Sequence, residues 1–153
     1  MLIREFYQGK IVMVNESAKL VEVASVMAQK DVGFVVVTRA ETSVPVGVIT
    51  DRDLVIRGVS KGLNFETTVG AIMTKTIFTV ESNQTLTEAV DIINKNKIRR
   101  LLVLDHAGNA WSVISSDDIL SYLTTQTDKV TRVFNAQNGE ASRNHLSEYT
   151  RMA

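Results

Sequence analysis

The chain has 153 residues, of which 44% are hydrophobic, and its 17 basic residues are balanced by 17 acidic ones. This length suits one domain or two small halves with a common core, and the zero formal charge gives no global attraction to nucleic acid or an anionic membrane. The absence of cysteine excludes disulfides and thiolate chemistry, and no apolar run reaches the roughly 18 residues of a membrane span, so we expect a cytoplasmic protein.

The first part of the chain predicts the order β-α-β-β-α. A short strand at 11–14 precedes a helix over about 17–30, in which apolar residues recur at helical spacing. A dense apolar strand is predicted at 34–37 and another at 45–49, and the latter runs directly into a charged segment that begins the last helix. The apolar runs predict strands that are buried on both faces.

The same order of elements then repeats. Ile11 corresponds to Ile77, an offset of 66 residues (77 − 11), and Asp53 corresponds to Asp118, an offset of 65 (118 − 53). The second copy predicts strands at 77–80, 101–104 and 111–114, with a helix at 85–96 that Thr85 and Glu88 cap. We therefore expect an α/β (α+β) fold with repeats at 3–62 and 69–124. Since each unit alone buries little surface, the two should pack about a pseudo-twofold axis into one core.

The C-terminal extension, residues 125–153, has no counterpart in the repeat. The polar run 135–139, which contains Gly139, is expected to break any helix. Leu146, Tyr149 and Met152 recur every three residues and predict a short amphipathic turn, so the extension is either a polar tail or a partly helical segment.

The repeated junction between strand and helix is the candidate site. Thr50 and Asp53 in the first copy, and Ser115 and Asp118 in the second, have the spacing of a capping box, which explains each pair by helix-end hydrogen bonds alone. The same hydroxyl and carboxylate could instead hold the vicinal diol of a ribose, while Gly47 lets a ligand approach the backbone. Both interpretations fit the residues.

Repeat length, element order and the run Gly-Val-Ile-Thr-Asp-Arg-Asp-Leu at 47–54 resemble a tandem pair of CBS (cystathionine-β-synthase) domains over residues 3–124. The resemblance implies a disc-like module with two clefts for adenine nucleotides or adenosyl ligands. In it, ribose would be held by Thr50 and Asp53 in one cleft and by Ser115 and Asp118 in the other. The remaining expected ligand contacts are Arg99 and Arg100 for phosphates and Ile11, Val12, Ile77 and Phe78 for adenine.

Each of these contacts has a simpler alternative. The arginines could line the solvated end of a strand, and the four apolar residues could be plain core. The second copy departs from the family pattern at Ser112, where glycine is usual, and the first copy has Gly33 and Phe34 where the second has the two arginines. We therefore expect unequal clefts, and we expect the one built on Thr50 and Asp53 to be the better ligand site.

Three classes of function compete for this sequence. It contains no zinc-binding His-Glu pattern, no phosphate-binding glycine loop and no nucleophile elbow, so we expect no enzyme, no catalytic residue, no catalytic cofactor and no metal. A regulatory sensor of AMP, ADP, ATP, NAD or S-adenosylmethionine is the leading hypothesis, and an interaction module with an empty cleft is the alternative. A sensor without an effector domain needs an effector protein as partner, and we expect a homodimer through apolar residues of the last helices: Leu54, Val55, Ile119, Leu120 and Leu123.

Overall fold

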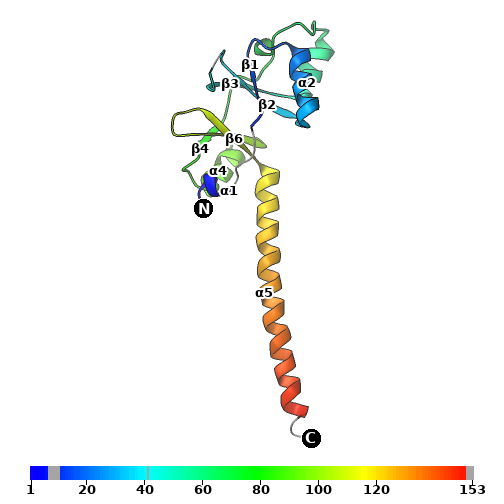
Figure 1. Ribbon diagram of the computed structural model, residues 1–153, viewed down its shortest axis with the longest axis vertical. Helices are drawn as coiled ribbons and strands as arrows, with labels where there is room; N and C mark the ends of the chain where they lie inside the picture. The colour runs from blue at the N-terminus through cyan, green and yellow to red at the C-terminus, as the bar shows by residue number, and fades with distance from the viewer. Residues whose placement is uncertain (7–10, 41, 151–153) are drawn as a thin grey trace. The chain divides into compact units, whose positions relative to one another are not determined.

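The computed structural model describes residues 1–6, 11–40 and 42–150, with side chains described as far as residue 136. The chain divides into two compact units, Met1–Ser115 and Ser116–Ala153. The first contains two three-stranded sheets, and the described residues of the second form one long helix (Figure 1). Among the described residues, no helix combines the length and the apolar character that a bilayer crossing requires.

The two sheets of the first unit have the same topology. Each has its strands in sequence order, the first pair parallel and the second pair antiparallel. After a short helix α1 (Ile3–Phe6), the first repeat contains β1 (Met13–Asn15), α2 (Leu20–Lys30), β2 (Phe34–Thr38) and β3 (Pro45–Thr50). The second contains β4 (Thr79–Glu81), α4 (Leu86–Asn96), β5 (Arg100–Leu104) and β6 (Ala110–Ser115). The predicted repeat and its element order are confirmed.

The opening strand of each repeat begins two residues later than the sequence predicts. Residues 11–12 and 77–78 lie ahead of β1 and β4, yet Val12 and Phe78 each accept one backbone hydrogen bond, from Val36 and Leu102 respectively. The apolar side chains of residues 11–12 and 77–78 are packed, but their backbone is outside the regular strand pairing. Hydrophobicity alone therefore predicted strands that begin two residues too early.

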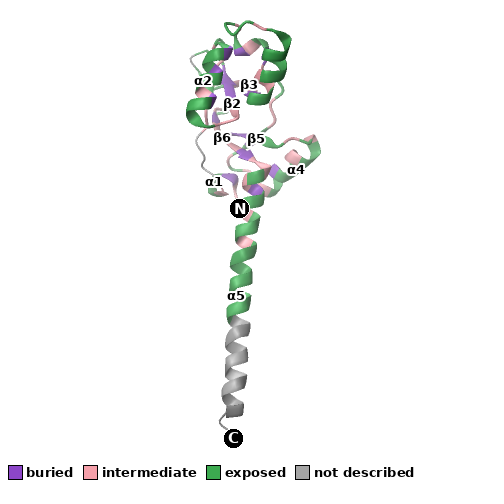
Figure 2. Ribbon diagram, turned by 90° about the vertical axis from the view of Figure 1, so that its right-hand side faces the viewer, coloured by how far each residue is buried: buried purple, intermediate pink, exposed green. Residues whose placement is uncertain are grey.

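The two faces of the central strand β2 serve two different cores. Leu20, Val23 and Met27 of α2 pack in one cluster with Val35 and Val37, whose side chains share one face of the strand. Val36 points the other way, into a cluster with Leu102 of β5. Buried residues accordingly gather in the strands (Figure 2).

That shared cluster joins the repeats at equivalent positions. Val36 corresponds to Leu102, Ile11 to Ile77 and Val48 to Val113, and all six belong to the cluster. Equivalent residues meet in this way when two copies pack about a pseudo-twofold axis. The predicted common core is thus present.

The helical segments after β3 and β6 differ. β3 leads into α3 (Asp51–Asp53), a π-helix η1 (Leu54–Gly58) and a 3-10 turn η2 (Val59–Lys61), and the second repeat opens with η3 (Val69–Ala71). β6 leads into α5 (Ser116–Thr150), which continues through residues 135–139. The predicted helix break is therefore wrong, because Asn and Gly weaken a helix by only about 1 kcal/mol each and no proline interrupts it. Leu146 and Tyr149 lie within α5, and Met152 lies outside the described residues.

Candidate functional site

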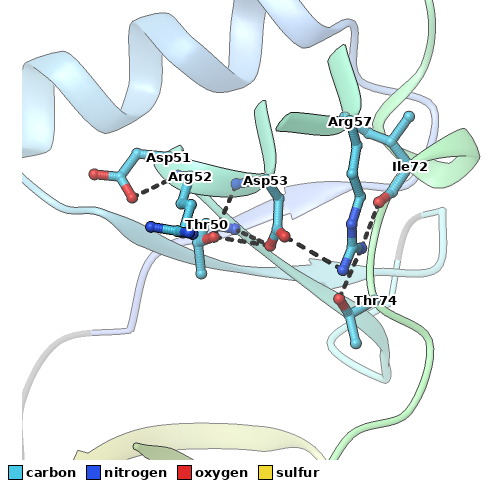
Figure 3. A network of polar contacts seen from close by, with 7 residues as sticks. All are labelled: Thr50, Asp51, Arg52, Asp53, Arg57, Ile72 and Thr74. Atoms are coloured by element: carbon cyan, nitrogen blue, oxygen red, sulfur yellow. Dashed lines mark hydrogen bonds and ion pairs between the residues drawn. The ribbon is translucent and has the colours of Figure 1, made fainter. Parts of the chain in front are cut away.

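Thr50 and Asp53 form the predicted capping box. The Thr50 hydroxyl accepts a hydrogen bond from the Asp53 amide at 3.1 Å. Asp53 Oδ2 accepts from the Thr50 amide at 3.0 Å and from the Thr50 hydroxyl at 2.8 Å (Figure 3). Thr85 and Glu88 make the same box at the start of α4. The two side chains at the first junction thus stabilise the helix start.

A second set of contacts extends from Asp53 through Arg57. Arg57 Nη2 lies 3.3 Å from Asp53 Oδ1, while Nη1 donates to the Ile72 carbonyl and to the Thr74 hydroxyl, both at 2.9 Å (Figure 3). The motif is thereby connected to the segment that opens the second repeat. Arg57 was not among the residues predicted from the sequence. Its spacing of four from Asp53 signals an ion pair, but nothing local indicates the partners at 72 and 74.

The segment that opens the second repeat also pairs with β3. The amides and carbonyls of Val48 and Thr74 exchange two hydrogen bonds, at 2.8 and 2.9 Å. Gly47 permits this approach, because a Cβ at position 47 would lie 2.8 Å from Met73 Cγ and 3.1 Å from the Thr74 carbonyl oxygen. The close neighbour at Gly47 is therefore the protein's own segment 73–74.

A pocket lies beside this junction within the first unit. It includes Ile77, Phe78 and Arg100, which the sequence analysis selected, together with Val48 and Thr74 from the paired segments. Thr74 joins the pocket wall to the network of Arg57 and Asp53. The complete lining is Phe34, Val48, Thr74, Thr76, Ile77, Phe78, Ile98, Arg100 and Leu102.

Arg100 and Phe34 occupy equivalent positions of the two repeats and contact each other. The guanidinium carbon of Arg100 lies 5.5 Å from the centroid of the Phe34 ring, within the range of a cation–π interaction. Arg100 thus carries a positive charge at the pocket rather than at an unrelated strand end. Arg99 is exposed and is not among the residues that line the pocket.

The other candidate residues, including Gly47, Thr50 and Asp53, are not part of the pocket lining. Ile11 packs in the cluster shared by the two sheets, and Val12 packs against the core of the first repeat. Ser115 ends β6 in the first unit, while Asp118 lies in the first turn of α5 in the second unit. Ser112, the counterpart of Gly47, is completely buried. Within the described ranges, no group of three or more His, Cys, Asp or Glu side chains could hold a metal ion.

Comparison with known proteins identifies the architecture. The CBS domain profile matches residues 3–59 and 69–125. An uncharacterised protein of Methanopyrus kandleri is 38% identical over 101 residues, which cover 65% of this chain and 51% of that protein. Hypoxic response protein 1 of Mycobacterium tuberculosis is 26% identical over 78% of this chain and 83% of its own length. The chain spans about half the length of the first of these relatives.

Solved structures agree with the profile. A CBS domain protein of Pyrobaculum aerophilum complexed with AMP superposes with a TM-score of 0.71 at 26% identity, covering 82% of this chain and 99% of that one. A CBS domain pair in complex with 5′-methylthioadenosine and S-adenosyl-L-methionine shares the fold, with a TM-score of 0.71 at 17% identity over 82% of this chain and 98% of that one. The chain belongs to the CBS domain family and contains two CBS domains in tandem.

Proposed function

We propose that this chain is a regulatory module that binds an adenine nucleotide or a related adenosyl ligand in the pocket between the two sheets. The observation that carries the proposal is the composition of that pocket, in which apolar residues of one repeat face Val48 of the other and Arg100 supplies a cation. The AMP complex of the Pyrobaculum aerophilum protein supports the same ligand class. Apolar side chains beside one guanidinium suit the binding of a ligand that has an apolar ring and a negative charge.

The ribose hydroxyls would donate hydrogen bonds to the oxygen lone pairs of Thr50 and Asp53 that the capping box does not use. The Thr50 hydroxyl has two lone pairs and accepts one hydrogen bond, from the Asp53 amide. Asp53 has about four lone-pair sites, of which the contacts to Thr50 and Arg57 occupy three. Each residue therefore keeps one acceptor site, and a vicinal diol brings two O–H donors.

The remaining parts of the ligand match the rest of the lining. Adenine would pack against Ile77 and Phe78, and a phosphate would meet the guanidinium of Arg100, which suits it in geometry and permanent charge. Arg99 could contribute to the same electrostatic attraction without lining the pocket. The second repeat is proposed to bind ligand more weakly, because the buried Ser112 stands where the first repeat has Gly47.

Ligand binding is tested by thermal denaturation and calorimetry with AMP, ADP, ATP, NAD and S-adenosylmethionine. A ligand at 100 times its Kd should stabilise the fold by about 2.7 kcal/mol. Asp53→Ala should abolish the shift and also cost about 1 kcal/mol as a lost cap. Glu88→Ala is the matched control, because it removes the same capping box from α4, away from the pocket, and should leave binding unchanged. No shift with any of the five ligands at millimolar concentration would reject the proposal.

An interaction module with an empty cleft is the second candidate. The observation in its favour is that Met73 and Thr74 occupy the space beside Gly47, which the sequence analysis assigned to a ligand. Saturation binding with any adenosyl ligand would exclude this candidate.

We further propose that the module forms a cytoplasmic homodimer that acts on an effector protein. Exposed apolar side chains on the helical side of the first repeat support the assembly: Val55 is 58% exposed, Val59 58% and Phe65 60%. They adjoin an apolar groove lined by Leu20, Val21, Ala24, Leu54, Gly58, Val59 and Phe65. In α5, Leu120 and Leu123 are exposed and available to a partner, whereas Ile119 is buried and Leu54 packs against the core.

A further inference from the structure

Arg57 joins Asp53, four residues before it, to Ile72 and Thr74, which lie 15 and 17 residues after it. Its guanidinium contacts the Asp53 carboxylate through one nitrogen and the Ile72 carbonyl and Thr74 hydroxyl through the other. Because the guanidinium is planar and its nitrogens have fixed positions, these contacts fix Asp53 relative to residues 72–74. One side chain thus connects the junction after β3 to the segment that opens the second repeat.

The second repeat carries no arginine at the position equivalent to Arg57. Arg57 lies in η1, whose wide π turn carries the hydrogen bond from the Val59 amide to the Leu54 carbonyl. π turns are rare, and they occur frequently at functional sites. The counterpart of Arg57 in the second repeat is Tyr122, at the offset of 65 residues (122 − 57), and a tyrosine cannot make this bridge. The bridge is therefore a specific feature of the Thr50–Asp53 junction.

The two carboxylate oxygens of Asp53 have different partners. Oδ2 makes both bonds of the capping box, whereas Oδ1 contacts Arg57. The side chain is only 19% exposed, so water has limited access to the acceptor site that remains. Arg57 also bonds to Thr74, which lines the pocket. Removal of Arg57 would leave the capping box in place, but Asp53 Oδ1 and Thr74 of the pocket lining would each lose their contact with the guanidinium.

We infer that Arg57 is a positioning residue for ligand recognition, which holds the Asp53 carboxylate toward a ribose diol and fixes it relative to the pocket wall. The inference rests on the proposed function and adds a specificity to it. The pocket should prefer nucleosides with an intact 2′,3′-diol, and Arg57 should be the origin of part of this preference although it does not itself touch the ligand.

The decisive experiment compares AMP with 2′,3′-dideoxy-AMP by calorimetry. The wild-type chain should bind AMP at least about tenfold more tightly, because the diol donates two hydrogen bonds to the junction and those to a carboxylate are the stronger kind. In Arg57→Gln the ratio of the Kd for 2′,3′-dideoxy-AMP to the Kd for AMP should fall to about threefold or less. Arg52→Gln is the matched control, since it removes the same charge from an exposed neighbour whose side chain makes no hydrogen bond or ion pair with the described part of the chain. Its ratio should equal that of wild type.

Each outcome decides the inference. If Arg57→Gln binds AMP and 2′,3′-dideoxy-AMP more weakly by the same factor, the ratio of their Kd values is unchanged. Arg57 then has only a structural role, and the proposed function still stands. If wild type binds AMP without preference for the diol, the inference also fails alone. If wild type binds no adenosyl ligand, the inference and the proposed function fail together. Should Arg57→Gln not fold by circular dichroism, Arg57→Lys keeps the charge but loses the fork, and a wild-type ratio in that variant would overturn the inference.

Discussion

Gly47→Ala is the sharpest test of how the first junction is built. The new Cβ would lie 2.8 Å from Met73 Cγ and 3.1 Å from the Thr74 carbonyl oxygen, both closer than ordinary van der Waals contact. In unstrained backbone, Gly→Ala stabilises a protein by about 0.4–1 kcal/mol, whereas overpacking costs about 1–3 kcal/mol. Since Gly47 has no positive φ, we expect a net loss of about 1–2 kcal/mol from the contact itself.

The loss is measured by urea denaturation and assigned by a double-mutant cycle with Met73→Ala. Met73 contributes the flexible part of the contact, so the double variant should recover about 1 kcal/mol relative to additivity. Gly58→Ala is the control, because its Cβ would meet Leu20 Cδ1 at 3.5 Å, an ordinary contact, and it should be neutral or stabilising. A Gly47→Ala variant as stable as wild type would show that residues 73–74 do not pack closely enough against Gly47 to exclude a Cβ.

Three further predictions concern charge and assembly. Arg100→Gln should weaken AMP binding about tenfold and adenosine binding much less by calorimetry, because only AMP carries the phosphate; equal losses would assign Arg100 to packing on Phe34. The Thr85 amide and hydroxyl lower the pKa of Glu88 below its ordinary value of 4.5, so its stabilisation is full above that value and is lost as pH falls through the lowered pKa. Glu88→Gln should therefore flatten the acid limb of stability in denaturant titrations, and an unchanged limb would contradict the cap. Val55→Lys should shift the mass in light scattering from dimer to monomer with little change in Tm, since the side chain is 58% exposed, whereas a persistent dimer would place the interface elsewhere.

The sequence predicted correctly those features of the structure that depend on residues close together in the chain. The capping boxes at Thr50 and Thr85 require partners three residues away, and the central strands require only dense apolar runs, so both were predicted and confirmed. The bridge of Arg57 joins residues 15 and 17 positions apart, which no local pattern indicates. The helix break at residues 135–139 was wrongly predicted, because single-residue propensities are weak compared with the cooperativity of a long helix.

The inequality of the two repeats has a physical cause at the contact between them. Phe34 and Arg100 are equivalent, and packing brings them together. Two arginines at these positions would place like charges about 5–6 Å apart, which is unfavourable near a protein surface, whereas an aromatic ring and a guanidinium attract each other. A cation at this contact is therefore best supplied by one repeat only.

Because the two repeats differ in this way, the proposed ligand contacts come from both of them. The first repeat contributes the carboxylate of Asp53, and the second contributes Arg100 together with the apolar residues that precede β4. A ligand that spans these groups contacts both repeats at once. Its binding free energy then depends on the relative position of the two repeats, which is the condition under which a ligand can shift a conformational equilibrium. The bridge from Asp53 through Arg57 to Thr74 joins the same two repeats, so the residue that would orient the ribose also contacts the segment that opens the second repeat.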